Sequence, residues 1–277
     1  MNDLPTITQQ AAGLRAGRTS STALVEAALA RIHAPAGEGA RAFMRVYDAQ
    51  ALAAARASDE LRAAGLARSP IDGLPVSIKD LFDVAGETTL AGSVARQGEP
   101  VAGADAPVVQ RLRAAGAVIV GRTNMTEFAF SGLGINPHYG TPLNAWDRSS
   151  GRIPGGSSSG AAVSVTDGMA VAGIGSDTGG SVRIPAALCG LVGFKPTARR
   201  VPLQGALPLS ASLDSIGPIA ASVACCAQID AVLSGRDLAL APATLRGLRL
   251  AVPLTVALDG MDDHVARSFR AALARLF

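Results

Sequence analysis

The sequence predicts an α/β protein in which helices cover a largely buried sheet. Amphipathic segments with helical spacing alternate with short apolar segments bounded by glycine, which is the pattern of layered α/β domains. The 277 residues suffice for a large core, and 17% charged residues is too few for a disordered chain. Because 48% of the residues are hydrophobic and only 4% are aromatic, that core must be mainly aliphatic.

Helices are expected first along the chain. Apolar residues recur at helical spacing over residues 7–32, and residues 20–22 are expected to cap the second of two helices there. Residues 48–66 form an Ala-rich amphipathic pattern that Gly65 closes. Residues 1–66 are therefore interpreted as an N-terminal group of helices.

The pattern then changes to that of short strands. A helix over residues 108–115, closed by Gly116, separates two of them, and Gly121 is expected to end the second. The expected strands cover residues 73–80, 117–120, 169–175 and 191–194. Further on, residues 248–252 predict a strand and residues 262–276 a helix, so this last β–α unit closes without a following strand.

Charge and cysteine usage argue against several classes of protein. The net charge of +3 comes from scattered arginines, and one Trp and two Tyr offer little base stacking, so nucleic-acid binding is not favoured. Cys189, Cys225 and Cys226 do not suit a disulfide framework, which fits a reducing cytoplasm. Neither a secretion signal nor an apolar stretch of membrane-spanning length is recognised, so no membrane partner is expected.

Two clusters of glycine and serine carry the strongest chemical signal, at residues 154–160 and 177–183. Consecutive glycines let backbone N–H groups converge on an anion, and a serine beside such donors suits acyl transfer. A single cluster of this kind is also explained by ordinary turns and helix caps. The first cluster ends a long loop-rich segment, residues 131–159, of a kind that is uncommon in compact domains unless it is functional.

A histidine base for such a serine has little support. Of the three histidines, only His138 lies in the loop-rich segment, and a loop histidine bonded to backbone explains it equally well. Residues 156–160 match the bare G-x-S-x-G pattern centred on Ser158, but no strand precedes them, as a nucleophile elbow requires.

Lysine is the alternative base. Lys79 and Lys195 are the only lysines among 25 basic residues, and Lys79 ends an apolar run. A desolvated lysine can lose its proton near neutral pH, whereas arginine cannot. Pairing of Lys79 with Asp80 or Asp83 at a strand end is the competing interpretation. Lys195, between a strand and a proline, is interpreted as structural.

Cofactor motifs are missing from the sequence. It contains neither the G-x-x-x-x-G-K-[ST] loop of nucleotide triphosphatases nor the G-x-G-x-x-G fingerprint of dinucleotide binding. His, Cys and carboxylate residues show no metal-ligand spacing. We therefore expect no cofactor and no metal.

Taken together, the motifs resemble the amidase signature family. The segments that carry the resemblance are residues 73–80 (GLPVSIKD), 121–128 (GRTNMTEF), 155–160 (GGSSSG), 177–185 (DTGGSVRIP) and 190–197 (GLVGFKPT). Their order, spacing and flanks agree with the family pattern, apart from Ser159, where glycine is frequent in the family. The resemblance covers nearly the whole chain.

The resemblance implies a Ser–cis-Ser–Lys triad and hydrolysis of a carboxamide to a carboxylate and ammonia or an amine. Its expected members are Ser181 as nucleophile, Ser157 after a cis peptide as the bridging serine, and Lys79 as base. The expected oxyanion donors are the backbone N–H groups of Thr178, Gly179 and Gly180, and the expected supporting residues are Ser158, Asp177 and Arg183. The expected partner is a small amide, whose pocket would lie around residues 128–139 and in a C-terminal region that is expected to be missing.

The resemblance also implies a mixed central sheet with helices on both faces. We expect one amidase-signature domain over residues 1–277, with a catalytic core at 71–200 and a partial C-terminal segment at 201–277. Because family members are generally much longer, the C-terminal part of the sheet is expected to be missing.

Two other functions remain open at this stage. One is the glutaminase-type A subunit of a tRNA-dependent amidotransferase, which would require a partner subunit. The other is a truncated, non-catalytic remnant. A homodimer is compatible with the amidase interpretation.

Overall fold

The computed structural model describes residues 4–237, 244, 246–252, 254 and 256–276. The chain divides into two compact units, Met1–Leu238 and Ala239–Phe277. The division falls inside the segment 201–277, which the sequence assigns to one domain with the rest of the chain. All the predicted site residues belong to the first unit.

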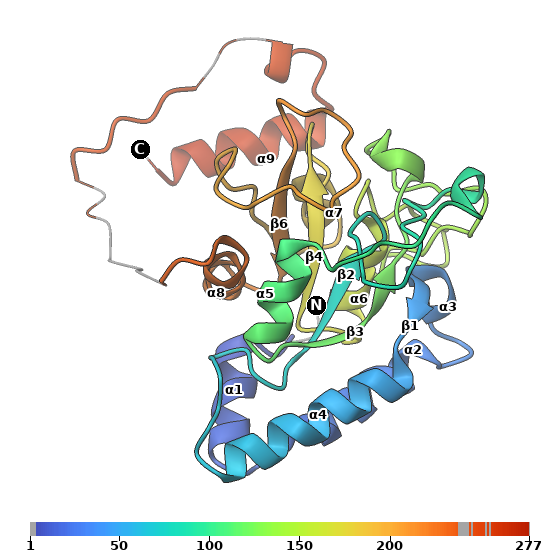
Figure 1. The fold of residues 1–277 in the computed structure, drawn as a ribbon. Helices are drawn as coiled ribbons and strands as arrows, with labels where there is room; N and C mark the ends of the chain where they lie inside the picture. Colours follow the sequence, from blue (N-terminus) through green and yellow to red (C-terminus); the bar gives the residue numbers. More distant parts are fainter. Residues whose placement is uncertain (1–3, 238–243, 245, 253, 255, 277) are drawn as a thin grey trace. The chain divides into compact units, whose positions relative to one another are not determined.

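A mixed six-stranded sheet forms the centre of the first unit, as predicted (Figure 1). Its strands, in spatial order, are β1 (Phe43–Val46), β3 (Val118–Thr123), β2 (Pro75–Lys79), β4 (Ala172–Asp177), β6 (Ser215–Ala220) and β5 (Val192–Gly193). Strands β3, β2 and β4 run parallel, and the strands outside them pair antiparallel. The carboxyl ends of β2 and β4 therefore meet at one edge, where open α/β sheets bind ligands.

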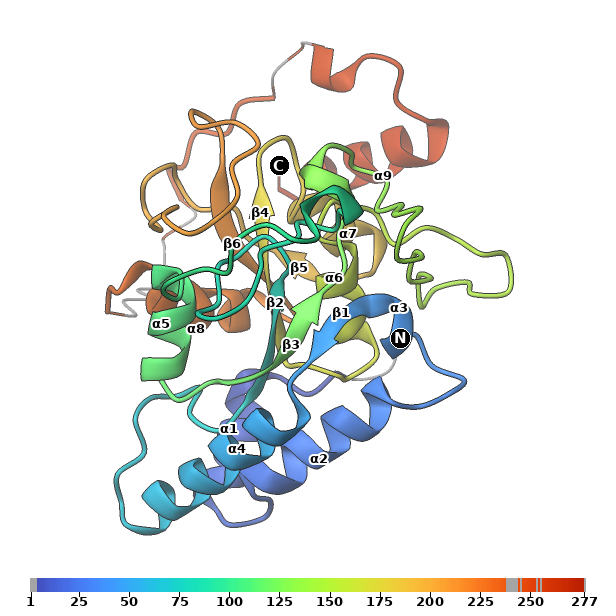
Figure 2. The same ribbon diagram turned by 45° about the vertical axis from the view of Figure 1, so that its right-hand side comes forward.

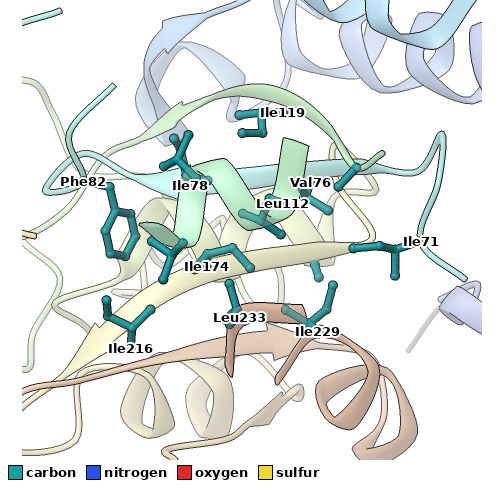
Figure 3. Close-up of a cluster of buried hydrophobic side chains, with 14 of the residues drawn as sticks. Ile71, Val76, Ile78, Phe82, Leu112, Ile119, Ile174, Ile216, Ile229 and Leu233 are labelled. Atoms are coloured by element: carbon teal, nitrogen blue, oxygen red, sulfur yellow. The ribbon is translucent and has the colours of Figure 1, made fainter. Parts of the chain in front are cut away.

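Helices cover both faces of the sheet, also as predicted (Figure 2). They are α1 (Ile7–Arg15), α2 (Ser21–Ile32), α3 (Gly39–Ala42), α4 (Asp48–Ala63), α5 (Pro107–Ala114), α6 (Ser159–Thr166), α7 (Arg183–Leu188) and α8 (Val223–Ser234), with short 3-10 turns at Val94–Arg96 and Glu127–Ala129. On one face, Leu112 of α5 and Leu233 of α8 belong to a buried cluster that also contains Ile119 of β3 and Ile216 of β6 (Figure 3). On the other, α2, α4 and α6 pack against Val118 and Val120 of the same strand.

Local sequence signals explain several element ends. Ser20 caps α2 by accepting a hydrogen bond from the Ala23 N–H, within the predicted capping segment. Gly65 follows α4 with a φ of 74°, a left-handed conformation that glycine adopts without strain. Strand β3, however, continues through Gly121. A side chain at Gly121 would meet the Arg45 carbonyl at 2.4 Å, so this glycine allows β1 to pair closely with β3.

The second unit differs from its prediction at one element. Residues 248–252 are not a strand. Among the described residues they have no neighbouring strand to pair with, and a lone strand is not stable in water. The predicted helix is present as α9 (Asp263–Ala274), after a 3-10 turn at Val256–Leu258. Its N-cap is Asp262, whose carboxylate accepts from the His264 N–H.

None of the helices in the described residues combines the length and the apolar character that a bilayer crossing requires.

Candidate active site

Lys79 lies at the centre of the predicted site. It is the last residue of β2, it is 0% exposed, and its ammonium reaches two hydroxyl groups. Nζ lies 2.6 Å from Ser157 Oγ and 2.9 Å from Ser176 Oγ. The competing interpretation of Lys79 as the partner of a neighbouring aspartate does not hold, because Asp80 pairs with Arg122 and Asp83 accepts from Thr89.

Burial lowers the pKa of Lys79 from 10.5 to about 7. The cause is loss of water around the ammonium, and the negative charges of Asp177 and Asp214 oppose it by favouring the charged form. A lysine with this pKa is a mixture of amine and ammonium near neutral pH. It can therefore accept a proton from the serine beside it.

The Gly156–Ser157 peptide bond is cis, which is the geometry that the family resemblance implies. The turn around it is tightly enclosed. The Thr126 N–H donates to the Ser157 carbonyl at 3.1 Å, and the Gly156 N–H donates to the Gly132 carbonyl at 2.8 Å. A side chain on Gly156 would lie 2.5 Å from the Gly134 nitrogen, so only glycine fits. These contacts hold Ser157 beside Lys79.

Ser158 joins this turn to the loop that carries Ser181. Its N–H donates to the Ser181 carbonyl at 3.2 Å, and its hydroxyl donates to the Ser176 carbonyl at 3.4 Å. Ser158 is 0% exposed, and Gly175 leaves room for it, since a side chain there would lie 2.5 Å from Ser158 Oγ. The Ser181 loop and the Ser157 turn are thus linked through backbone rather than through flexible side chains.

Asp177 organises the turn between β4 and α7. Its carboxylate accepts the Gly180 N–H at 2.8 Å, the Val182 N–H at 3.1 Å and the Arg183 side-chain Nε–H at 3.0 Å. Burial by itself raises the pKa of Asp177, but the hydrogen bonds from Arg183 and Val182 outweigh it, so the pKa lies below its usual value. Asp177 is therefore a carboxylate that shapes the Ser181 turn, with Arg183 as its counter-ion.

Gly180 differs from its predicted role. Its N–H donates to Asp177 Oδ1 at 2.8 Å, and its φ is 135°, a backbone conformation that favours glycine. In this structure it is a structural donor. The N–H groups of Thr178 and Gly179 remain the predicted oxyanion donors.

Two residues beside the site were not anticipated from the sequence. Ser176 contacts Lys79 across 97 positions, and Asp214 contacts Thr178 across 36. The Asp214 carboxylate accepts the Thr178 hydroxyl and the N–H groups of Leu209 and Ser210. Ser176 stands directly before Asp177, so the serine in the run S-D-T-G-G-S was a usable signal, whereas Asp214 has no local motif.

The alternative bases lie outside this cluster. His138 Nε2 is 3.3 Å from Glu127 Oε1, and Lys195 Nζ donates to the Pro196 carbonyl, which agrees with the structural interpretation of Lys195. The cysteines Cys189, Cys225 and Cys226 are buried and free. In the part of the chain that the structure describes, no three His, Cys, Asp or Glu side chains gather as ligands for a metal ion.

A cavity of about 430 Å³ opens beside Ser176 and Thr178. It lies at the carboxyl edge of the sheet, between the end of β2 and the loop of residues 203–214. Its lining includes the apolar residues Leu81, Leu207 and Ile216 and the carboxylate residue Asp214. A substrate group that occupied it would lie next to Thr178, one of the predicted oxyanion donors.

Known proteins share much of this sequence. A family model described as Amidase matches residues 23–276. The A subunit of the glutamyl-tRNA(Gln) amidotransferase of Anaeromyxobacter dehalogenans (strain 2CP-C) is 45% identical over 276 residues, 95% of this chain and 55% of that protein. The 2-amino-5-chloromuconic acid deaminase of Comamonas testosteroni is 40% identical over 273 residues, 98% of this chain and 59% of that protein.

Solved structures give the same relationship. Native peptide amidase from Stenotrophomonas maltophilia is similar with a TM-score of 0.76 and 40% identity, over 84% of this chain and 48% of that one. The chain thus spans about half the length of the relatives it matches. Because the family model matches residues 23–276 and these relatives are 40–45% identical over the aligned residues, the chain belongs to the amidase signature family.

Proposed function

We propose that the protein is an amidohydrolase that cleaves a carboxamide through an acyl-enzyme on Ser181. The observation that carries the proposal is the contact of 2.6 Å between Ser157 and a lysine whose pKa burial lowers to about 7. A buried lysine with a pKa near 7 is suited to proton transfer, whereas a surface ion pair requires a lysine that stays charged.

The proposed reaction begins with two proton transfers. Neutral Lys79 takes the hydroxyl proton of Ser157, and the Ser157 oxygen takes the hydroxyl proton of Ser181. The Ser181 oxygen then forms a bond to the amide carbonyl carbon, whose oxygen becomes an anion. The N–H groups of Thr178 and Gly179 would stabilise that anion, because donors fixed before the reaction need no reorganisation during it.

The second half of the reaction returns the protons. The carbon–nitrogen bond breaks as the proton held by Lys79 passes back through Ser157 to the leaving nitrogen, which departs as ammonia or an amine. A water molecule then attacks the acyl carbon, its proton follows the same route, and Ser181 regains its hydrogen as the carboxylic acid leaves. The steps balance without an external oxidant, reductant or cofactor.

The proposal is tested by ammonia release from a panel of aliphatic, aromatic and amino-acid amides. The unaltered chain is expected to turn over at least one of them, and Ser181→Ala is expected to turn over none. A companion measurement follows labelling of Ser181 by a fluorophosphonate with peptide mass spectrometry. Absence of both turnover and labelling in a folded sample would instead support a non-catalytic remnant.

A glutaminase-type subunit is the second candidate, favoured by 45% identity to the A subunit of an amidotransferase. In this case the same triad would release ammonia from glutamine or asparagine for a partner subunit that co-purifies. Turnover of simple aliphatic or aromatic amides by the isolated chain would argue against it as the main role. A cytoplasmic location suits either candidate, since three free cysteines fit a reducing compartment.

A further inference from the structure

We propose that Asp214 is a positioning residue of this site, which fixes Thr178 in place and ties it to the loop that forms the cavity wall. The inference rests on the proposed amidohydrolase function. The hydrogen bonds of Asp214 in the described residues go to Thr178, Leu209 and Ser210 rather than to the triad serines, so it would act through Thr178.

The carboxylate of Asp214 divides its two oxygens between two elements. Oδ1 accepts the hydroxyl of Thr178, the residue that follows β4. Oδ2 accepts the N–H groups of Leu209 at 2.9 Å and Ser210 at 3.0 Å. Asp214 is only 9% exposed, so little water can solvate its carboxylate. The three hydrogen bonds take the place of that water and hold the carboxylate in one orientation.

The loop on the far side of Asp214 is part of the site. The Leu207 N–H donates to the Leu81 carbonyl at 2.9 Å, two residues beyond Lys79, and both residues line the cavity. The loop is therefore attached at one point to the end of β2 and at another, through Asp214, to the end of β4. A displacement of Asp214 would move the cavity wall and Thr178 together.

Asp177 and Asp214 bind the turn that carries the predicted oxyanion donors in different ways. Asp177 holds its turn by using the Gly180 N–H, which removes that group from the site. Asp214 holds Thr178 by its side-chain hydroxyl, so the backbone N–H of Thr178 is not consumed by this contact. The Ser215 hydroxyl donates to the Asp177 carbonyl at 3.0 Å and supports the same strand end from the next residue.

The charge of Asp214 provides a readout that a purely structural residue would not have. Asp177 and Asp214 are the two carboxylates whose charges favour the ammonium form of Lys79. Replacing Asp214 with asparagine removes one negative charge, so the pKa of Lys79 should fall further. The acidic limb of the rate profile, where Lys79 becomes protonated, should then move to lower pH.

The test compares kcat, KM and the rate of Ser181 labelling by a fluorophosphonate across pH. Asp214→Asn should reduce the labelling rate and kcat/KM by about 10²-fold, the order expected when a reacting group is misplaced by about 1 Å. It should also shift the acidic limb to lower pH. Thr178→Val should reduce both rates similarly but leave the limb in place, because the charge remains. Thr178→Ser, which keeps the hydroxyl, should restore most of the rate.

Asp230→Asn is the matched control. Asp230 is a buried carboxylate on α8 that pairs with Arg200, outside the site, so its loss should change stability without changing the pH limb or kcat/KM. The thermal midpoint of every variant shows whether it is folded. If Asp214→Asn fails to fold, a comparison of Thr178→Val with Thr178→Ser still tests whether the hydrogen bond between the Thr178 hydroxyl and Asp214 supports the reaction.

Two results would overturn the inference in distinguishable ways. In the first, Ser181 of the unaltered chain reacts with the fluorophosphonate, and Ser181 of Thr178→Val or Asp214→Asn reacts at the same rate with the acidic limb of the pH profile in the same place. Asp214 then has no positioning role, and the proposed function stands. If the unaltered chain neither labels nor turns over, the proposed function fails and the inference fails with it.

Discussion

The two lysines of the chain occupy opposite chemical situations. Lys195 is partly exposed and donates to the carbonyl of its neighbour Pro196. Lys79 is fully buried between two serine hydroxyls, without an ion-pair partner among the described residues. At the scale of single residues, the proposed function therefore depends on a lysine whose burial favours loss of its proton.

Lys79→Arg should reduce amide turnover by about 10²-fold to 10⁴-fold, the usual contribution of a general base. Arginine keeps the positive charge but cannot be deprotonated in a protein, so the proton transfer from Ser157 would stop. Steady-state kinetics on the best amide of the panel would measure the loss. Lys195→Arg is the matched control and should retain full activity; equal effects of the two substitutions would show that Lys79 is not the base.

The residues that the sequence could identify are those with a local signal. Lys79 stands out as a rare lysine at the end of an apolar run, and Ser157 and Ser181 lie in glycine-rich clusters whose family resemblance assigns their roles. Ser176 stands next to Asp177 in the second of these clusters, although its contact with Lys79 arises only when β2 and β4 pair. Asp214 has no local signal, because its contact with Thr178 arises only when the loop after β5 meets the end of β4. The family resemblance implies that the Gly180 N–H is an oxyanion donor, whereas its hydrogen bond to Asp177 depends on turn geometry that the sequence does not show.

At the scale of elements, close packing of β2, β3, β4 and α6 holds the site in place. The layered pattern, and thus the mixed sheet and its two helical faces, could be predicted from alternating segments and the family resemblance. Strands β1 and β6 could not, since Phe43–Val46 is short and half-exposed, and Ser215–Ala220 contains a proline and a glycine that are atypical of central strands. Their pairing with β3 and β4 overrides these weak propensities.

Gly173→Ala should destabilise the protein by about 1–3 kcal/mol, the usual cost of overpacking a core. Gly173 lies in β4, and a methyl group there would be 2.7 Å from the Ala161 carbonyl oxygen of α6. Urea denaturation measures the change in the free energy of unfolding. Gly103→Ala is the control, since nothing lies within 4 Å of a side chain there, and equal stabilities of the two variants would disprove the close contact.

A buried ion pair joins β2 to β3 directly after Lys79. Arg122 Nε donates to Asp80 Oδ1 at 2.8 Å, and both side chains are 2% exposed. Arg122→Met should cost about 3–5 kcal/mol of unfolding free energy, because it leaves a buried carboxylate without its partner. The double variant Asp80→Asn with Arg122→Met should be more stable than Arg122→Met alone in urea denaturation. If the double variant loses the sum of both single effects, the pair is not coupled.

At the scale of the whole chain, the apolar core belongs to the first unit. Every buried hydrophobic side chain that the structure describes lies between Ile7 and Leu233. The chain spans about half the length of the relatives it matches.

A chain ending at residue 238 should therefore keep a cooperative thermal transition, with a midpoint close to that of residues 1–277. The reason is that the hydrophobic clusters, which supply most of the stability, remain intact in it. Differential scanning calorimetry on both chains makes the comparison. Loss of the cooperative transition would show that residues 239–277 contribute to the fold of the first unit.

The most direct measurement of the proposed chemistry is the pH dependence of Ser181 labelling by a fluorophosphonate. Only the neutral amine of Lys79 can accept a proton, so the labelling rate should rise with pH and level off, with a midpoint at about 7. In Lys79→Arg the labelling should be slow at every pH and show no such midpoint. A labelling rate on Ser181 that does not change across neutral pH, or that Lys79→Arg retains, would contradict activation of this serine by Lys79.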